Sequence, residues 1–235
     1  MIFDKDGTLI EFDAFWVKVA ENALSDVIYD LSLSDVSPKL LLGAIGVSNG
    51  VTDVNSVLCK GTYEEIGETV YSVLIEKGYS PDRSTVIDKV ISAFTKNAHT
   101  GDVRPTCERL RDTLTALKAS GKRLALVTTD NPEITRLCLE KLGVSELFEW
   151  VFTDDGATPQ KPDPYCIQKL SSLTGIPTDR MVMIGDTMTD MKFAKNGGIS
   201  SVAVCKDGKN SELLAPHATY VISRISELTD MMEIT

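Results

Sequence analysis

Short apolar segments that end in acidic or hydroxyl residues recur along this chain, and they constrain its fold more than any other feature. Beyond about residue 100, these segments alternate with amphipathic stretches of helical periodicity. Apolar runs of this length between helices are typical of parallel strands that are buried on both faces. They predict an α/β fold with an open parallel sheet, in which ligands bind beyond the carboxyl ends of the strands.

Four of the expected strand ends carry polar side chains from distant parts of the sequence. They are Asp4 and Asp6, Thr128 and Thr129, Asp154 and Asp155, and Asp186. Because ligands bind at the carboxyl edge of such a sheet, we expect these groups to converge there. Only three residues precede Asp4, so we expect a very short first strand, and whether further residues precede Met1 is left open.

The sequence between the first strand and about residue 100 has apolar residues at three- and four-residue spacing. This pattern predicts helices over DAFWVKVAENALSDVIYDL, PKLLLGAIG, EEIGETVYSVLIEKG and DRSTVIDKVISAFTKNA, with SPDR as a cap and a loop around SNGVTDVNS. We expect residues 14–99 to form an all-helical insert, and residues 1–13 and 100–235 to form the α/β unit. Because the insert follows the first strand, we expect it to lie as a lid over the same sheet edge.

Composition excludes several classes of partner. The formal net charge of −10 argues against binding to nucleic acid or to an anionic membrane surface. No apolar run is long enough to span a bilayer, and the N-terminus lacks the features of a secretory signal. The five cysteines form no CxxC pair, which predicts neither a zinc site nor a disulfide framework and favours the cytoplasm.

Asp4 and Asp6 are two residues apart, so on a strand their side chains would point the same way. Like charges this close resist being ionised together unless a cation or a shared proton relieves them. A surface turn is the alternative interpretation, because Asp and Gly are favoured in turns. The intervening Lys5 should point the opposite way, and we expect it at the surface.

The residue types at these strand ends suit phosphoryl transfer. A carboxylate nucleophile, a neighbouring carboxyl group as acid and base, and a hard cation suffice for transfer through an aspartyl-phosphate. Mg²⁺ prefers oxygen ligands, and Asp4 and Asp186 would supply the charge that holds it. Thr128 with nearby backbone N–H groups can bind phosphoryl oxygens, and Lys161 in QKPDP can neutralise remaining charge. Asp190 lies four residues after Asp186, so both can face the metal if a helix begins there.

Taken together, these segments resemble the four motifs of the haloacid dehalogenase superfamily of aspartate-nucleophile phosphotransferases. The DxDGT motif is present as residues 4–8, and the apolar strand that ends in threonine is LALVT, with Thr128. The lysine before Pro-Asp-Pro is Lys161, and GDxxxD is residues 185–190. The motifs occur in this order, the resemblance covers the whole chain, and it is greatest to the phosphoglycolate-phosphatase-like branch.

The resemblance implies a Rossmann-like core with an inserted helical cap of class one, which opens for substrate and closes to exclude water. It implies that Asp4 is the nucleophile and a metal ligand. Asp6 would be the general acid for the leaving group and then the base for water, with its backbone carbonyl on the metal.

The remaining motif residues would bind the phosphoryl group and the metal in such a family member. Thr128 and Lys161 would hold the phosphoryl group, and Thr129 could add a backbone donor, although turn formation explains Thr129 equally well. Asp186 would ligate Mg²⁺. Asp190 would ligate the metal directly or through water, or would orient Lys161.

The implied function is a Mg²⁺-dependent phosphatase for a small phosphate monoester, phosphoglycolate-like or a sugar phosphate, acting as a monomer or homodimer. Dehalogenases of this superfamily generally lack the second aspartate of the first motif, which is present here as Asp6. A sugar phosphomutase that uses the same phosphoaspartate is the alternative, because the motifs do not exclude it. A non-catalytic binding protein on the same scaffold is disfavoured, since Asp4, Asp6 and Lys161 are all present.

Overall fold

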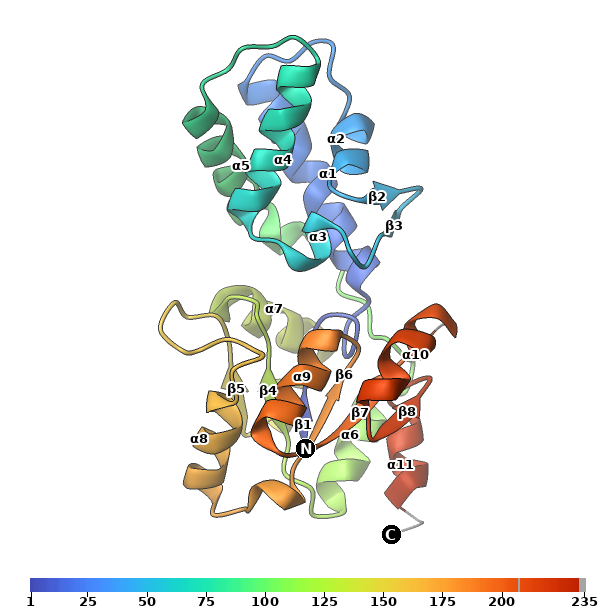
Figure 1. Cartoon of the computed structure of the whole chain (residues 1–235). Helices are drawn as coiled ribbons and strands as arrows, with labels where there is room; N and C mark the ends of the chain where they lie inside the picture. The colour runs from blue at the N-terminus through green and yellow to red at the C-terminus, as the bar shows by residue number, and fades with distance from the viewer. Residues whose placement is uncertain (207, 233–235) are drawn as a thin grey trace. The chain divides into compact units, whose positions relative to one another are not determined.

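The computed structural model of the chain describes residues 1–206 and 208–232, and it divides into two compact units (Figure 1). We call Met1–Glu11 with Val103–Thr235 the α/β unit, and Phe12–Asp102 the helical unit. The expected α/β unit was residues 1–13 and 100–235, so the observed boundaries differ from the expected ones by two or three residues. The insert therefore begins and ends close to where the hydrophobic periodicity changes.

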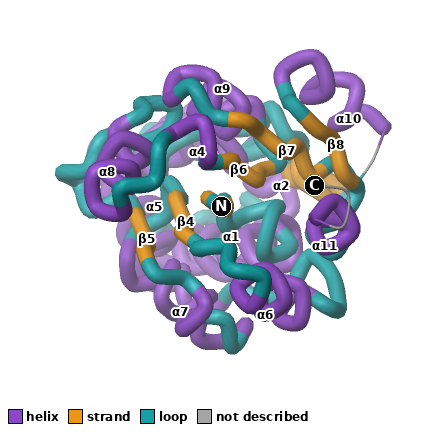
Figure 2. The backbone as a smooth tube through the Cα atoms, turned by 90° about the horizontal axis from the view of Figure 1, so that it is seen from below, coloured by secondary structure: helices purple, strands orange, loops and turns teal. Residues whose placement is uncertain are grey.

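The described part of the α/β unit contains a parallel sheet with the strand order β5-β4-β1-β6-β7-β8 (Figure 2). Its strands are β1 (Ile2–Phe3), β4 (Ala125–Val127), β5 (Trp150–Phe152), β6 (Val182–Gly185), β7 (Ser200–Val204) and β8 (Tyr220–Ile222). Numbered within this sheet alone, the order is 3-2-1-4-5-6, which is the Rossmann order. The order reverses direction between β1 and β6, so the topological switch point lies at their carboxyl ends.

The first strand is as short as expected, yet it is paired on both sides. Ile2 is in register with Ala125 on β4 and with Met183 on β6. Beyond the strand, the Asp4 N–H donates to the Ile184 carbonyl at 2.9 Å. This bond extends the ladder to Asp4 and fixes its backbone at the switch point.

Helices cover both faces of the sheet, as Figure 2 shows. They are α6 (Leu110–Ala119), α7 (Pro132–Leu142), α8 (Tyr165–Thr174), α9 (Met188–Gly197), α10 (Gly208–Leu214) and α11 (Glu227–Met232). Side chains alternate across a strand, so Ile2 packs in one cluster with residues of α8 and α9, and Phe3 packs in another with residues of α6, α7 and α11. The unit is therefore a three-layer α/β/α structure, as the apolar runs predicted.

The helical unit has its own apolar core. Its helices are α1 (Phe12–Asp30), α2 (Pro38–Ala44), α3 (Val57–Lys60), α4 (Tyr63–Glu76) and α5 (Arg83–Asn97), and α5 packs against both α1 and α4. The predicted cap in SPDR is confirmed, because the Asp82 carboxylate accepts a hydrogen bond from the Thr85 N–H at 2.8 Å. Such a bond satisfies one of the unpaired N–H groups at the start of a helix.

The segment SNGVTDVNS, expected as a loop, contains a short antiparallel hairpin of β2 (Val47–Ser48) and β3 (Val51–Thr52). Its two turn residues, Asn49 and Gly50, have φ angles of 52° and 77°. Turns of type I′ require positive φ at both central residues, which is why they favour Asn-Gly. The hairpin is tied to α1, since the Thr52 N–H donates to the Asp13 carboxylate at 3.0 Å.

The two segments that lead into and out of the insert are paired within the α/β unit. Ile10 and Pro105 form an antiparallel bridge. The Glu11 N–H donates to the Arg104 carbonyl at 2.9 Å, and the Thr106 N–H donates to the Leu9 carbonyl at 3.0 Å. The insert is therefore joined to the sheet through a short two-stranded stem.

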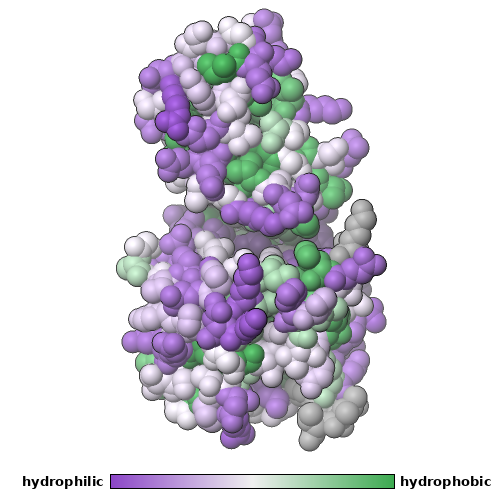
Figure 3. All heavy atoms as spheres, in the orientation of Figure 1, coloured by the Kyte–Doolittle hydropathy of each residue, from purple (hydrophilic) through white to green (hydrophobic). Residues whose placement is uncertain are grey.

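Hydrophilic residues predominate on the face shown in Figure 3, interrupted by small groups of hydrophobic ones. This distribution accords with a chain in which 25% of the residues are charged. Among the helices that the structure describes, none combines the length and the apolar character needed to cross a membrane.

Candidate active site

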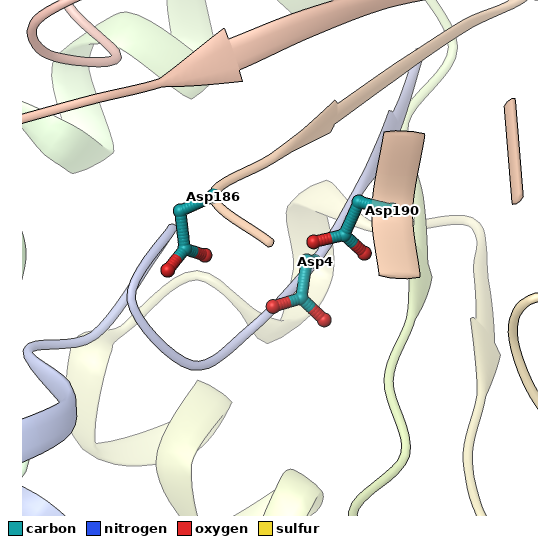
Figure 4. A group of neighbouring side chains, drawn as sticks. All are labelled: Asp4, Asp186 and Asp190. Atoms are coloured by element: carbon teal, nitrogen blue, oxygen red, sulfur yellow. The ribbon is translucent and has the colours of Figure 1, made fainter. Parts of the chain in front are cut away.

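Three carboxylates converge at the switch point, and we call them the acidic cluster: Asp4, Asp186 and Asp190 (Figure 4). Asp4 follows β1, Asp186 follows β6, and Asp190 lies in the first turn of α9. One oxygen of each carboxylate lies within 4.8 Å of one oxygen of each of the others. The predicted convergence of strand ends is therefore confirmed for Asp4 and Asp186, and Asp190 joins them from the helix that was expected to begin there.

Lys161 lies against the acidic cluster. Its Nζ donates to Asp4 Oδ1 at 2.6 Å and to Asp190 Oδ1 at 2.7 Å, and its side chain is only 4% exposed. Burial disfavours the charged ammonium, but the Asp190 and Asp4 carboxylates outweigh it and hold the pKa of Lys161 above its usual value. Lys161 is thus a buried cation between two aspartates, and we call these three residues the Lys161 network.

The Asp190 carboxylate is fixed by the start of its own helix. Its Oδ2 accepts hydrogen bonds from the Thr187 hydroxyl at 2.6 Å and the Thr187 N–H at 3.1 Å. In return, the Thr187 hydroxyl accepts from the Asp190 N–H, which completes a capping box. Gly185 leaves the necessary room, because a Cβ there would lie 2.5 Å from Asp190 Oδ2.

Asp186 is held from the first motif. The Thr8 hydroxyl donates to Asp186 Oδ1 at 2.7 Å, and Asn210 Nδ2 donates to the Asp186 carbonyl at 3.2 Å. Gly7 has a φ of +78°, and a Cβ at Gly7 would lie 2.0 Å from Asp186 Oδ2. The glycine of DxDGT is therefore required both by its backbone conformation and by the approach of this carboxylate.

The acidic cluster has the donor set and the electrostatics of a site for a hard divalent cation. Burial raises the pKa of Asp4 against the lowering effect of Lys161, and Asp190 adds to the increase. Burial and the charges of Asp4 and Asp190 likewise raise the pKa of Asp186 well above its usual value. A cation bound among these oxygens would favour the ionised carboxylates, and oxygen ligands are those that Mg²⁺ prefers. The residues therefore fit the metal that was predicted.

The expected surface position of Lys5 is wrong, because its side chain is buried. Asp4 and Asp6 do not lie together on a strand, although the charge of Asp6 contributes to the raised pKa of Asp4. β1 ends at Phe3, and Asp4, Lys5 and Asp6 enter a turn in which the Leu9 and Ile10 N–H groups both donate to the Lys5 carbonyl. The alternation of side chains along a strand therefore does not apply to them.

In this turn the Asp6 carboxylate lies outside the acidic cluster and pairs with Lys5. Lys5 Nζ donates to Asp6 Oδ1 at 2.8 Å, and Asp130 Oδ2 lies 3.0 Å from the same nitrogen. The Lys5 side chain is 0% exposed. Burial opposes its charge, but Asp6 and Asp130 outweigh this effect and raise the pKa of Lys5. We call these three residues the Lys5 network.

Thr128 is buried at the end of β4, the strand next to β1, whereas Thr129 is exposed. Adjacent strands lie about 4.8 Å apart, so Thr128 is one strand away from Asp4. Asp154 and Asp155 are exposed, and the Asp155 carboxylate accepts from the Thr158 N–H at 2.7 Å. The structure thus supports a local turn at Asp155, and neither residue belongs to the acidic cluster.

Three residues of the site were given no side-chain role from the sequence. Thr8 orients Asp186, Thr187 caps the helix that carries Asp190, and Asp130 contacts Lys5. Thr187 had a readable signal, because a hydroxyl residue three positions before an acidic residue indicates a helix start. The contact with Asp130 could not be read from local spacing, since it joins the turn after β1 to the turn after β4.

Comparisons with known proteins agree with this geometry. The family model of haloacid dehalogenase-like hydrolases matches residues 1–198. The chain is 27% identical over 235 residues to a phosphoglycolate phosphatase of Neisseria meningitidis, covering 98% of this chain and 92% of the relative. It is 26% identical over 164 residues to the pyrophosphatase PpaX of Bacillus velezensis, covering 69% of this chain and 74% of the relative.

A solved structure of the HAD-hydrolase YfnB from Bacillus subtilis, bound to magnesium, is similar with a TM-score of 0.69 and 20% identity. The match covers 98% of this chain and 96% of the other, and at this identity it shows a shared fold. The predicted family is thereby confirmed, since the sheet order, the motifs and the family match over residues 1–198 agree. The chain belongs to the haloacid dehalogenase-like hydrolases.

Proposed function

We propose that this hydrolase is a Mg²⁺-dependent phosphatase that cleaves a small phosphate monoester through an aspartyl-phosphate. The observation that carries this proposal is the Lys161 network beside Asp186 at the switch point. A buried ammonium bound to the Asp4 carboxylate at 2.6 Å suits a site in which negative charge accumulates next to a nucleophile. Members of the same family supply the reaction class.

In the first step, an Asp4 carboxylate oxygen attacks phosphorus, and the bond between phosphorus and the ester oxygen breaks. Asp6 gives its proton to the departing alcohol oxygen. In the second step, water attacks the phosphorus of the aspartyl-phosphate, Asp6 takes the proton of that water, and the bond between phosphorus and Asp4 breaks. Inorganic phosphate leaves, and both aspartates return to their starting states.

Asp4 and Asp186 would hold the Mg²⁺ ion, and the Asp6 carbonyl would be a further ligand. The ion would supply charge that stabilises the transferring phosphoryl group. Asp190 lies in the acidic cluster, but its oxygens are bonded to Lys161 and Thr187, so we assign it to the orientation of Lys161. The magnesium in the YfnB structure supports the choice of ion.

Thr128 and Lys161 would bind the phosphoryl oxygens, with Thr129 offering its backbone N–H. Thr128 suits this role because its hydroxyl lies at the buried end of β4, the strand that pairs with β1. The Thr128 hydroxyl already accepts a hydrogen bond from the Asp130 N–H at 3.2 Å, which leaves its own proton for a phosphoryl oxygen.

For the substrate, we propose a phosphoglycolate-like ester or a sugar phosphate. The support is the likeness to a phosphoglycolate phosphatase over 98% of this chain. The partial match to a pyrophosphatase adds an anhydride to the candidates. We assign the role of the cap to the helical unit, Phe12–Asp102, which the chain inserts directly after the first motif.

The test is phosphate release from a panel of phosphoglycolate, sugar phosphates, pyrophosphate and p-nitrophenyl phosphate, with Mg²⁺ and then with a chelator. We expect hydrolysis that requires the metal and prefers one ester. The Asp4→Asn variant should be inactive, whereas Asp179→Asn, the same change at an exposed position, should retain full activity.

Hydrolysis that is equally fast in the chelator, or in Asp4→Asn, would contradict the proposal. Conversion of a hexose 1-phosphate in the presence of a bisphosphate primer, without net phosphate release, would identify the phosphomutase instead.

A further inference from the structure

The Lys5 network places a completely buried ammonium between the two motif aspartates in sequence, and the reaction described above makes no use of it. Lys5 is 0% exposed, while its partner Asp6 retains 18% of its side-chain exposure. The ammonium contacts both oxygens of the Asp6 carboxylate, at 2.8 Å for Oδ1 and 2.7 Å for Oδ2. Asp6 is thus held from its buried side while part of it stays accessible.

Net stability is a poor explanation for a buried ion pair of this kind. Removing an ammonium and carboxylates from water carries a desolvation cost that their attraction often fails to exceed. An apolar side chain of similar size in place of such a pair is frequently neutral or stabilising. The position in which the pair holds the Asp6 carboxylate is therefore a better explanation for it than stability.

The anchor of this network is the turn after β4. Asp130 Oδ2 lies 3.0 Å from Lys5 Nζ, and Asp130 Oδ1 accepts from the Asn131 N–H at 2.9 Å. The Asp130 N–H donates to the Thr128 hydroxyl at 3.2 Å. A continuous set of contacts therefore runs from Thr128, which would bind phosphate, through Asp130 and Lys5 to Asp6.

We propose that Lys5 is a positioning residue. Together with Asp130, it holds the Asp6 carboxylate in the orientation toward the phosphate site that proton transfer requires. This role rests on the proposed function, because it assumes that Asp6 is the acid and base. Lys5 itself touches neither the substrate nor the reacting atoms.

The role has a kinetic signature that a purely structural role lacks. A good leaving group such as p-nitrophenolate departs with little help from an acid, whereas an alkoxide requires a proton. Because kcat/KM reports the first phosphoryl transfer, a misplaced Asp6 should lower kcat/KM much more for alkyl phosphates than for p-nitrophenyl phosphate. General loss of structure would lower kcat/KM for all esters alike.

The experiment compares kcat/KM for a series of esters, from p-nitrophenyl phosphate to an alkyl phosphate, at saturating Mg²⁺. Lys5→Met removes the charge and keeps the chain length, and Lys169→Met is the matched change at an exposed lysine of α8. For Lys5→Met we expect a loss on the alkyl ester that is roughly 10- to 100-fold greater than the loss on p-nitrophenyl phosphate. This is at or below the lower end of the roughly 10²- to 10⁴-fold contribution of general acid catalysis, because Asp6 is displaced and not removed. Lys169→Met should match the wild type throughout.

A second variant keeps the test decisive if Lys5→Met does not fold, as judged by circular dichroism. Lys5→Met combined with Asp130→Asn removes the buried cation and a buried anion together, so it leaves less uncompensated charge. It should show the same selective loss on alkyl phosphates. Equal losses on every ester, or no loss, in either folded variant would overturn the role of Lys5.

The failure of this role and the failure of the proposed function are separable in the wild-type data. A wild-type chain that releases phosphate, with variants that show no selectivity for the leaving group, overturns the role of Lys5 alone. A wild-type chain that releases no phosphate from any ester overturns the proposed function and this role with it.

Discussion

Two buried lysines in this molecule each lie between two aspartates, but they hold different catalytic groups. Lys161 binds Asp4, the proposed nucleophile, and Lys5 binds Asp6, the proposed acid and base. Lys161 is supplied by a loop 157 residues after Asp4, and its partners Asp4 and Asp190 have side chains that are 9% and 0% exposed. Lys5 is the sequence neighbour of Asp6, and that partner is more exposed. The Lys161 network shares Asp4 and Asp190 with the acidic cluster, whereas the Lys5 network shares none of its carboxylates with it.

A lysine between two aspartates occurs in both networks, but a bound metal ion would affect the charge balance of only one of them. In the Lys161 network, a bound cation would share Asp4 with the ammonium and help to neutralise Asp190 and Asp186. In the Lys5 network, neither aspartate belongs to the acidic cluster, so an ion bound in that cluster would not take the place of Lys5 as their partner. Variants that lack one lysine, or the carboxylate that it holds, should therefore differ between the two networks in activity, in stability and in their response to Mg²⁺.

The largest effect is expected when the proposed catalytic carboxylate of each network, Asp4 or Asp6, is replaced by its amide. Asp4→Asn removes the proposed nucleophile and should lower kcat by more than about 10³-fold. Asp6→Asn should slow turnover severely and leave phosphoenzyme that accumulates, because water then lacks its base. Rapid quench with labelled substrate and denaturing gels would measure the trapped phosphate. Comparable kcat for Asp4→Asn and the wild type would contradict the assignment of the nucleophile.

The second prediction compares the stability of the lysine variants. Lys161→Met leaves two buried carboxylates without their cation and should lower the free energy of unfolding by about 3–5 kcal/mol. Because Asp4 is also a proposed metal ligand, Mg²⁺ should recover part of this loss. The loss in Lys5→Met should not be recovered by Mg²⁺ beyond the shift that the wild type shows. Urea unfolding of the wild type and both variants, each with and without Mg²⁺, measures the six values, and equal recovery in both variants would remove the distinction.

The parallel sheet of the α/β unit was readable from the sequence, because buried parallel strands appear as apolar runs between amphipathic helices. The acidic cluster followed from the strand ends and from the spacing of Asp186 and Asp190. The alternation of side chains along the short first strand did not predict the positions of the side chains that follow it. Asp4 continues the ladder, whereas Lys5 and Asp6 belong to a turn whose conformation depends on Gly7.

One further detail depended on a contact that local patterns do not describe. The partnership of Lys5 with Asp130 joins turns that are distant in sequence. The hairpin of β2 and β3 did have a local signal in Asn49-Gly50, but its strands are too short for alternation to show. The substrate preference also could not be read from the sequence, since it depends on side chains placed by tertiary structure.

The third prediction tests the metal through stability alone. A ligand that binds only the folded state stabilises it by about 2.7 kcal/mol at a concentration 100 times its Kd. Mg²⁺ should therefore raise the thermal midpoint of the wild type, and Asp186→Asn should lose most of this shift. Asp130→Asn, the same change in the Lys5 network, should keep it. A thermal shift that survives Asp186→Asn would place the ion elsewhere.

The smallest expected effect concerns the support of the Lys161 network by helix capping. Thr187→Ala removes the hydroxyl that caps α9 and donates to Asp190 Oδ2 at 2.6 Å. Loss of an N-cap costs about 1 kcal/mol, which corresponds to a decrease of roughly 2–4 °C in the thermal midpoint of a chain of this size. Activity should also fall, because Asp190 then orients Lys161 less firmly.

Thr62→Ala is the matched control, because Thr62 caps α4 through the same kind of capping box in the helical unit. It should lower the thermal midpoint by a similar amount, since the lost hydrogen bonds are alike. The capping partner of Thr62 is Glu65, which is not a residue of the Lys161 network, so the Thr62→Ala variant should lose less kcat/KM than Thr187→Ala at a temperature where both are folded. Equal kcat/KM in the two variants would show that the cap of α9 contributes only stability, and that Asp190 orients Lys161 without help from Thr187.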